Sequence, residues 1–283
     1  MIDFKNTSSI DETSIDLRVK KIVSGNLKTF TKKEGLKTIL SMIDLTTLEG
    51  ADTDKKVIDL CKKANSFKTL GKDIPNVAAV CVYPTMVKVA KKTLKGTNIK
   101  VASVAGAFPS GQSTLAIKVA EVNFAISEGA DEIDMVISRG KFLEGEYNLV
   151  YDEIAAIKDF CKNIHLKVIL ETGELQTLTN VNRASVIAMN AGADFIKTST
   201  GKINPAATEQ ATLVMLDAIN NFYKENGKMI GMKPAGGISD PSIALNYLKL
   251  LENTLDKKWF CNEWFRFGAS RLADKLVAEI LAS

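Results

Sequence analysis

Short apolar runs alternate with longer stretches of helical periodicity along the chain from about residue 39 onward. Strands of a parallel sheet that is covered on both faces have this continuously apolar character. The runs therefore predict eight buried strands, at residues 39–43, 77–82, 99–104, 132–137, 166–170, 194–196, 229–232 and 264–267.

The stretches between the runs carry the signals of amphipathic helices. In one of them apolar residues recur on one helix face, at spacings of four, three and four: Leu115, Val119, Val122 and Ile126. An Asn–Pro pair at 204–205 and an Asp–Pro pair at 240–241 each combine a capping side chain with proline at the first helical position. Three glycines are expected to end helices: Gly129, Gly192 and Gly227.

Eight strands that alternate with eight helices over roughly 250 residues match a closed (β/α)8 barrel, the TIM barrel. An open doubly wound sheet is the alternative, and the lack of a GxGxxG motif after the first predicted strand disfavours it. Before the repeat, Ser9 and Glu12 have capping-box spacing and are followed by a helical apolar stripe at 15, 19, 22 and 23. We therefore predict an N-terminal helical extension over residues 1–35, packed on one barrel domain over residues 36–283.

Composition and charge exclude several classes of protein. Hydrophobic residues make up 46% of the chain and charged residues 25%, which is ordinary for a globular protein. The net charge is only +4 and the two signs are interspersed, which disfavours a nucleic-acid partner. The first residues lack a signal peptide, and no apolar stretch approaches the roughly 18 residues that span a bilayer. With four cysteines and no CxxC pair, we expect a cytoplasmic protein with reduced thiols and no membrane partner.

The histidine content excludes further classes of enzyme, because His165 is the only histidine in the chain. Zinc hydrolases, zinc aldolases and Ser-His-Asp enzymes all depend on histidine. We therefore expect no catalytic metal, and chemistry carried by carboxylates, lysines or backbone groups. His165 itself precedes a predicted strand and is interpreted as a turn or surface residue.

Two lysines are notable at the C-terminal strand ends, where barrel enzymes place their active sites. Lys197 and Lys233 follow apolar residues at matching places on neighbouring predicted strands, so their amines could converge. Two ammonium groups about 5 Å apart repel by roughly 3 kcal/mol at an effective dielectric of about 20, or about two pKa units. Desolvation acts in the same direction and favours the free amine of a Schiff-base nucleophile. The same pattern would also arise if the lysines only reach solvent or pair with Asp134 or Glu171.

Asp134 lies on the same strand face as Glu132 and nearer the catalytic end. It could move protons between water and a carbinolamine, or it could be a buried counter-ion that holds a lysine in place.

The ends of the last three predicted strands favour anion binding. Barrel enzymes often hold phosphate in the loops after strands 7 and 8. Gly236 and Gly237 occupy one such loop, and Gly268 and Ser270 occupy the other. Lys202 could add a charge. Either loop alone could be only a tight turn, but the two together favour phosphate.

Motifs at all eight strand ends resemble those of the deoxyribose-phosphate aldolase family, from about residue 36 to the end of the chain. The combination around Lys197 and Lys233 is the most specific. The matching segments are IDLTTL at 43–48, NVAAVCVYP at 76–84, FPSG at 108–111, EID at 132–134, ETGEL at 171–175, KTSTGK at 197–202, GMKPAGG at 231–237 and FRFGAS at 265–270.

The resemblance implies a class I aldolase that reversibly cleaves 2-deoxy-D-ribose 5-phosphate into acetaldehyde and D-glyceraldehyde 3-phosphate, without metal or cofactor, in deoxyribonucleotide catabolism. It makes Lys197 the Schiff-base nucleophile. Lys233 would depress the pKa of Lys197 and relay protons with Asp134. The substrate contacts that it implies are Thr46, Thr200, Gly201, Lys202, Gly236, Gly237, Gly268, Ser270 and, less directly, Asp44.

Two features depart from the family pattern. Many members have an arginine or lysine two residues after the paired glycines, where this chain has Ser239; Arg271 could take over its contact with phosphate. Some members also end in a tyrosine-bearing tail, whereas this chain ends with residues 280–283, Ile-Leu-Ala-Ser. Two alternatives stay open: another Schiff-base sugar-phosphate aldolase, such as a transaldolase or a ketose-bisphosphate enzyme, and a phosphosugar-binding barrel without catalysis. The sequence is also compatible with a homo-oligomer.

Overall fold

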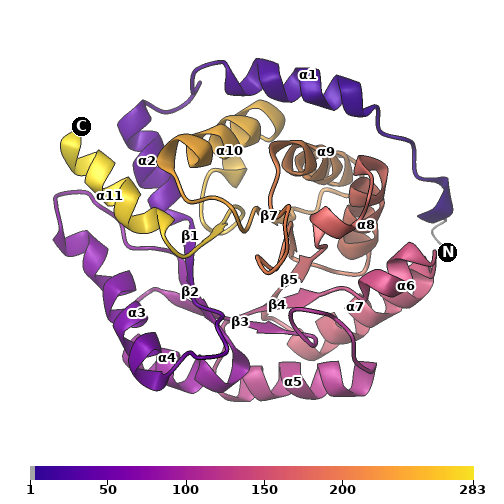
Figure 1. Cartoon of the computed structure of the whole chain (residues 1–283), viewed down its shortest axis with the longest axis horizontal. Helices are drawn as coiled ribbons and strands as arrows, with labels where there is room; N and C mark the ends of the chain where they lie inside the picture. The colour runs from indigo at the N-terminus through magenta and orange to yellow at the C-terminus, as the bar shows by residue number, and fades with distance from the viewer. Residues whose placement is uncertain (1–3) are drawn as a thin grey trace.

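Eight parallel strands form a nearly closed barrel at the centre of the chain, in a computed structural model that describes residues 4–283 (Figure 1). The strand order is β7-β6-β5-β4-β3-β2-β1-β8, and isolated bridges between Met232 and Phe265 and between Ala235 and Gly268 close the ring. The prediction of a (β/α)8 barrel is confirmed. The strands are β1 (Ile43–Thr46), β2 (Ala79–Val82), β3 (Lys100–Ala105), β4 (Glu132–Val136), β5 (His165–Ile169), β6 (Phe195–Lys197), β7 (Gly231–Lys233) and β8 (Phe267–Ala269).

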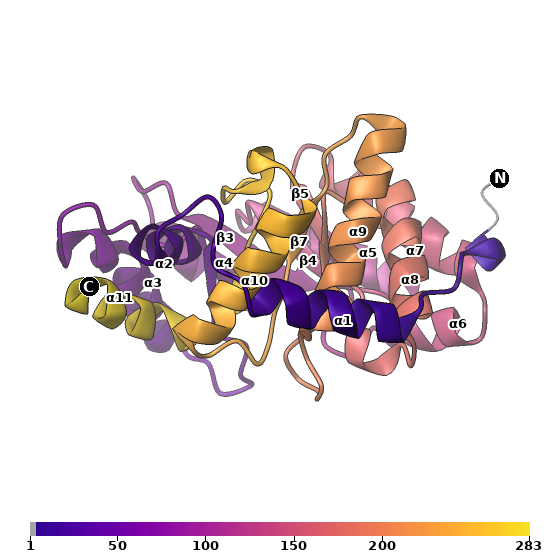
Figure 2. The ribbon, with the colours of Figure 1, turned by 90° about the horizontal axis from the view of Figure 1, so that it is seen from above.

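Helices surround the barrel on its outer face (Figures 1 and 2). They are α1 (Glu12–Val23), α2 (Lys32–Ser41), α3 (Asp54–Ser66), α4 (Val87–Thr93), α5 (Leu115–Ser127), α6 (Arg139–Leu143), α7 (Tyr147–Cys161), α8 (Leu178–Asn190), α9 (Glu209–Asn226), α10 (Pro241–Thr254) and α11 (Leu272–Ala282). Short 3-10 turns lie at η1 (Phe4–Asn6), η2 (Phe67–Thr69), η3 (Pro84–Met86), η4 (Thr172–Glu174) and η5 (Lys257–Trp259). Within residues 4–283, no helix combines the length and the apolar character needed to cross a bilayer.

Helix α1 lies outside the repeat and packs against α9 and α10, as Figure 2 shows. Its apolar stripe buries Ile15 and Val19. The helix begins after Asp11, whose carboxylate accepts from the backbone N–H of Thr13 at 3.1 Å, so the predicted cap at Ser9 is wrong by two residues. The division of the chain at residue 35 stays a prediction, and α2 runs across that position.

Several predicted boundaries are wrong. Residues 39–41 belong to α2 rather than to the first strand, which begins at Ile43. A buried helix end runs directly into a buried strand here, and an apolar run this short does not distinguish the two. At 204–205 no helix begins. The loop continues to Thr208, whose hydroxyl accepts from the backbone N–H of Ala211 and caps α9.

The eighth strand, predicted at 264–267, spans Phe267–Ala269 and shares only Phe267 with the prediction, whereas the remaining helix-boundary signals are confirmed. Asp240 caps α10 and proline follows it at the first helical position. The three glycines expected at helix ends have left-handed backbone conformations, with φ values of +102°, +99° and +67° at Gly129, Gly192 and Gly227. His165 was interpreted as a turn or surface residue, but it is the half-buried first residue of β5.

Helix α5 forms where the periodicity predicts it, and Val119, Val122 and Ile126 pack against the core as predicted, but the stripe is wrong at its first turn. Leu115 is 41% exposed, whereas Lys118 is fully buried. The Lys118 ammonium donates to Glu153 at 2.6 Å and to Ser138 at 2.8 Å. A buried ion pair of this kind has no apolar signature in the sequence, so the predicted stripe missed it.

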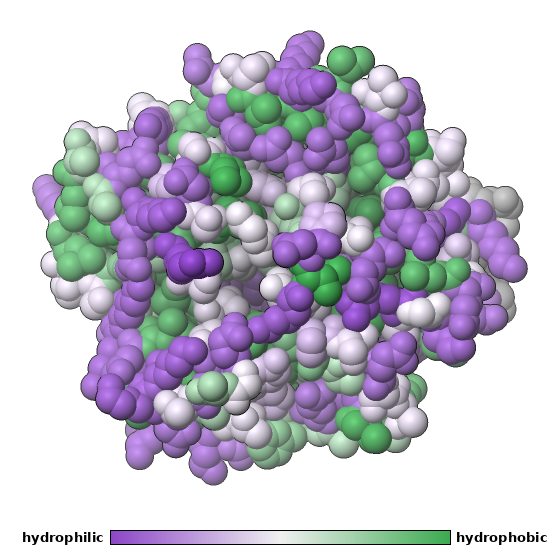
Figure 3. Space-filling view, viewed as in Figure 1, coloured by the Kyte–Doolittle hydropathy of each residue, from purple (hydrophilic) through white to green (hydrophobic). Residues whose placement is uncertain are grey.

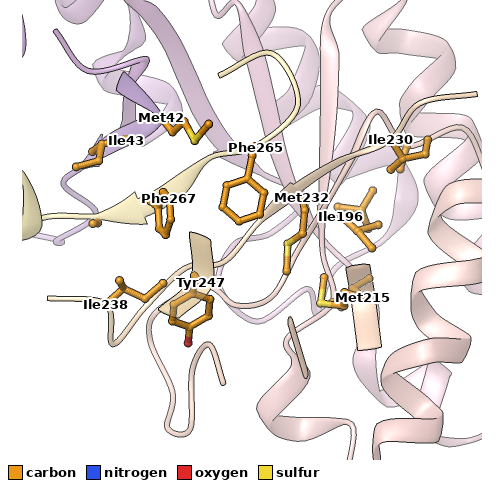
Figure 4. Close-up of a cluster of buried hydrophobic side chains, with 14 of the residues drawn as sticks. Met42, Ile43, Ile196, Met215, Ile230, Met232, Ile238, Tyr247, Phe265 and Phe267 are labelled. Atoms are coloured by element: carbon orange, nitrogen blue, oxygen red, sulfur yellow. The ribbon is translucent and has the colours of Figure 1, made fainter. Parts of the chain in front are cut away.

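The main hydrophobic core lies between the outer face of the barrel and its helices. Figure 4 shows part of it, where residues of β6, β7 and the region of β8 meet α9 and α10. The rings of Phe265 and Phe267 stand 5.2 Å apart near Tyr247. A smaller apolar cluster lies at Leu48, Cys81, Ala102, Val104, Phe108, Val136 and Ile169, with Tyr83 against it.

Gly231 provides the space for one large inward side chain. It pairs in register with Phe195, and a Cβ atom added at Gly231 would lie 2.4 Å from the Phe195 ring. We predict that Gly231→Ala lowers the free energy of unfolding by roughly 2 kcal/mol, because the fully buried ring must move. Urea denaturation measures the change. Gly50→Ala is the control, because nothing lies within 4 Å of its added Cβ; equal effects at both positions would contradict the prediction.

Candidate active site

A cavity of about 700 Å³ opens where the strands end, between the loops after β1, β6, β7 and β8 and helix α3. Figure 3, viewed down the barrel, shows a hollow near the centre of this end of the molecule. Nine of the twelve predicted site residues line the cavity: Thr46, Lys197, Thr200, Gly201, Lys202, Gly236, Gly237, Gly268 and Ser270. The other three, Asp44, Asp134 and Lys233, are fully buried and do not reach its wall.

Lys197 and Lys233 end neighbouring strands in matching register, so the barrel places their side chains side by side. Each amine donates to the same oxygen of Asp134, Oδ2, at 2.8 Å. The two amines therefore lie within the span of two hydrogen bonds. Lys197 is 3% exposed and lines the cavity, whereas Lys233 is enclosed.

These three residues belong to a larger group of buried ionisable side chains inside the barrel. Lys167 donates to the other oxygen of Asp134 at 2.9 Å and to Glu132 at 2.5 Å. Arg266 donates to Glu132 at 2.8 Å and to Asp44 at 2.7 Å. We call the whole group the buried charge cluster: Asp44, Glu132, Asp134, Lys167, Lys197, Lys233 and Arg266.

Asp44 completes this cluster, although the resemblance places it among the substrate contacts. Its Oδ2 accepts from Lys233 at 2.5 Å and its Oδ1 accepts from Arg266. Both oxygens are thus engaged away from the cavity.

Lys167 and Arg266 were not predicted as site residues from the sequence, and Glu132 was given no role. Strand alternation offered one signal. Glu132 lies two residues before Asp134, and Lys167 pairs in register with Asp134 across β4 and β5. Both side chains therefore point into the barrel with Asp134.

Most members of the cluster are held in their charged forms. Burial disfavours the charge of each one, but the opposite charges outweigh it. Burial lowers the pKa of Lys233, while Asp134 and Asp44 raise it well above its ordinary value. The pKa values of Lys167 and Arg266 are raised in the same way by neighbouring carboxylates. Burial raises the pKa of Asp134, yet Lys167, Lys197 and Lys233 together hold it well below its ordinary value.

Lys197 is the exception. Burial lowers its pKa, Asp134 opposes this, and the charge of Lys233 lowers it again, with a net decrease from 10.5. Asp134 is its only carboxylate partner among the described residues, and Lys167 and Lys233 share that carboxylate. The amine that faces the cavity is therefore the one that gives up its proton most readily. Asp134 itself, ionised and accepting from three lysines, has the geometry of a counter-ion.

The glycine-rich end of the cavity is shaped by backbone requirements. Gly236 has φ +81°, and a Cβ there would lie 2.6 Å from Ala206. Gly237 has φ +78° with open space around it, so its conformation alone favours glycine. A Cβ at Gly268 would collide with Ala235 at 2.6 Å. These residues leave bare backbone along the cavity wall, the surface that a phosphate group needs.

Besides Lys197, four basic side chains line the cavity, and three of these four already have carboxylate partners. The pairs are Lys202–Glu49 at 3.0 Å, Lys56–Asp52 at 2.5 Å and Lys63–Asp274 at 2.5 Å. Arg271, on the loop before α11, has no carboxylate within salt-bridge distance in residues 4–283. It lines the cavity together with Ser239.

Glu171, which the sequence offered as a possible partner of the two lysines, instead fixes Thr200 in the cavity wall. Its carboxylate accepts from the Thr200 backbone N–H at 3.1 Å and from the Thr200 hydroxyl at 2.5 Å. Arg139 donates to the same carboxylate at 3.0 Å. Glu171 has a left-handed backbone (φ +55°), a conformation that costs energy for a residue with a side chain and is held here by these contacts.

A lysine-lined cavity at the C-terminal end of a (β/α)8 barrel is the arrangement of a barrel aldolase. Comparison with known proteins agrees: the model of the DeoC/LacD family of aldolases matches residues 38–249, and the chain belongs to this family of lyases.

Relatives named deoxyribose-phosphate aldolase share much of the sequence. The human protein is 47% identical over 251 residues, which is 85% of this chain and 79% of the relative. A putative deoxyribose-phosphate aldolase from Caenorhabditis elegans is 45% identical over 249 residues, 87% of this chain and 82% of that one. The crystal structure of a putative deoxyribose-phosphate aldolase from Coccidioides immitis superposes with a TM-score of 0.74 at 27% identity, covering 96% of this chain and 98% of that one.

The carboxylates of the buried charge cluster make the free energy of unfolding depend on pH in the acid range. Their folded pKa values lie below the unfolded values near 4, so their stabilisation is complete above about pH 4 and is lost as pH falls through the folded values. We predict that Asp134→Asn lowers the free energy of unfolding by about 3–5 kcal/mol at pH 7, because three lysines lose their partner. Its further decline below pH 4 should be shallower than in the wild type. Urea denaturation from pH 7 to pH 2.5 measures both, and parallel acid slopes would contradict the role of Asp134.

Proposed function

We propose that this protein catalyses the reversible cleavage of 2-deoxy-D-ribose 5-phosphate into acetaldehyde and D-glyceraldehyde 3-phosphate through a Schiff base on Lys197. One observation carries the proposal. Of the four cations in the buried charge cluster, Lys197 is the one that lines the cavity and the one whose pKa is lowered. The names of the relatives support the choice of substrate.

The chemistry begins at the neutral amine of Lys197. It adds to the C1 aldehyde of the open-chain sugar, and loss of water from the carbinolamine gives an iminium ion. The iminium accepts the electron pair as the C2–C3 bond breaks and the C3 hydroxyl loses its proton. D-Glyceraldehyde 3-phosphate leaves an enamine on Lys197. Protonation at C2 and hydrolysis then release acetaldehyde and restore the amine.

Lys233 and Asp134 support this sequence from behind Lys197. The positive charge of Lys233 favours the neutral form of its neighbour before the attack. Asp134 accepts from both amines and so orients Lys197 toward the cavity. Because both are fully buried, we propose that they exchange protons with the substrate through Lys197 or through a water molecule in the cavity.

The rest of the cavity suits a phosphorylated sugar. We assign the phosphate to the backbone of Gly201, Gly236, Gly237 and Gly268, the Ser270 hydroxyl and the Lys202 ammonium. Arg271 supplies the charge that Ser239 lacks. Thr46 and Thr200 face the sugar hydroxyls, and Asp44 acts through Lys233 rather than by contact. A role in deoxyribonucleotide catabolism, a cytoplasmic location and a homo-oligomeric state are predictions that accompany this function.

Borohydride trapping tests the proposal and separates its alternatives. We predict that acetaldehyde followed by reduction leaves an ethyl group on Lys197, mapped by mass spectrometry of the digest. Lys197→Met should lose the adduct and at least about a thousand-fold of the cleavage rate. An adduct on Lys233 would reverse the assignment of the nucleophile. Turnover of another sugar phosphate in preference would identify a different aldolase, and the absence of a selective adduct would identify a binding protein.

Arg271→Ala tests the phosphate assignment. We predict an approximately ten-fold higher KM for 2-deoxy-D-ribose 5-phosphate, because a charge-assisted hydrogen bond of about 1.5 kcal/mol is lost, and little change in kcat. The KM for unphosphorylated 2-deoxy-D-ribose should stay the same. Lys63→Ala is the matched control, because Lys63 lines the same cavity but already pairs with Asp274. Equal effects of the two variants, or an equal effect on both sugars, would contradict the assignment.

A further inference from the structure

Three members of the buried charge cluster have no part in the chemistry proposed above: Glu132, Lys167 and Arg266. They are 3%, 0% and 2% exposed, and none lines the cavity. Yet burying charged groups is costly, and replacing such networks with apolar residues is often neutral or stabilising. The position of these three residues directly behind the active lysine therefore calls for a function.

The charges of the cluster do not balance when every member is ionised. It holds the three carboxylates of Asp44, Glu132 and Asp134, and the four cations Lys167, Lys197, Lys233 and Arg266, so one positive charge is in excess. Protonating a carboxylate would enlarge the excess, whereas removing one proton from a lysine cancels it. An uncompensated buried charge is strongly unfavourable, so the cluster favours a state with one neutral lysine.

Geometry decides which lysine becomes neutral. Lys167 has Glu132 at 2.5 Å and Asp134 at 2.9 Å, and Lys233 has Asp44 at 2.5 Å and Asp134 at 2.8 Å. Lys197 has only Asp134, at 2.8 Å, and it alone of the three meets the cavity through which a proton can leave.

We propose that Glu132, Lys167 and Arg266 are positioning residues that set the protonation state of Lys197 through the charge balance of the cluster. This inference rests on the proposed function only in taking Lys197 as the nucleophile. Lys167 acts on Lys197 by holding the other oxygen of the shared carboxylate of Asp134. Arg266 binds Glu132 and Asp44 together, which keeps both carboxylates ionised and directed at Lys167 and Lys233.

The titratable groups of the cluster around Lys197 come from several strands of the barrel. Glu132 and Asp134 lie on β4, Lys167 on β5, Lys233 on β7 and Asp44 on β1, with Arg266 just before β8. Cys81 on β2 is the remaining titratable neighbour. Burial raises the pKa of its thiol, so it stays uncharged and does not enter the balance.

The charge balance predicts that substitutions of Lys167 and Glu132, which contact each other, shift the pKa of Lys197 in opposite directions. Lys167→Met removes a positive charge, so Lys197 should hold its proton more strongly and its pKa should rise by about one unit. Glu132→Gln removes a negative charge, so the pKa of Lys197 should fall by a similar amount. The double variant restores the balance and should return the pKa to within about half a unit of the wild type.

The readout is the pH dependence of acetylation of Lys197 by trace acetic anhydride, quantified by mass spectrometry. This measurement reports the free amine and requires no turnover. The acid limb of kcat/KM for 2-deoxy-D-ribose 5-phosphate is recorded beside it and should move with the same sign. If Lys167→Met does not fold, the effect of Lys167 on the pKa of Lys197 is obtained by comparing Glu132→Gln with the double variant.

A second buried ion pair is the matched control. Lys118 and Glu153 are buried, like Lys167 and Glu132, and lie 2.6 Å apart, but on α5 and α7. Lys118→Met and Glu153→Gln should destabilise the protein and leave the titration of Lys197 unchanged. The proposal is overturned if Lys167→Met and Glu132→Gln shift Lys197 in the same direction, or if neither shifts it. Opposite shifts without cleavage of the sugar phosphate would uphold it and refute the proposed substrate.

Discussion

The structure of the site depends on one carboxylate that three lysines share. Asp134 accepts from Lys167, Lys197 and Lys233, and the parallel register of β4 to β7 brings all three within hydrogen-bond distance. One negative charge cannot neutralise three ammonium groups. Lys167 also pairs with Glu132 and Lys233 also pairs with Asp44, whereas Lys197 has no second carboxylate among the described residues and lines the cavity. The barrel thereby lowers the pKa of one buried lysine, Lys197, through burial and the number and placement of the neighbouring charges.

The cavity next to Lys197 also has a surface that suits a phosphate group. The loops after β6 and β7, and strand β8 itself, present bare backbone because left-handed conformations or close contacts require glycine there. Lys197 lines the same cavity, so a sugar held by its phosphate could extend its carbonyl toward the amine. Glu171 and Arg139 fix Thr200 between the two regions. In the function we propose, the loops supply binding and the strand ends supply the chemistry, as is typical of (β/α)8 enzymes.

Much of this arrangement could be predicted from the sequence, because it follows local patterns. Apolar runs indicated eight strands, and the matching places of Lys197 and Lys233 indicated that their amines meet. The contacts of Arg266 could not be predicted from local patterns, because they depend on closure of the barrel. Arg266 reaches Glu132 and Asp44 only when β8 lies beside β1. The start of the first strand was misplaced because the mainly apolar run at residues 39–43 covers both the buried end of α2 and the buried start of β1. Lys118 was missed because a buried ion pair leaves no periodic signal.

The central claim is that Lys197 is the neutral lysine of an otherwise charged cluster. Nuclear magnetic resonance of protein with 15N-labelled lysine side chains, with signals assigned by substitution, tests it most directly. We expect the Lys197 amine to titrate below its ordinary value of 10.5, while Lys167 and Lys233 stay protonated to higher pH. Titration of Lys233 before Lys197, or of Lys197 at or above 10.5, would contradict it.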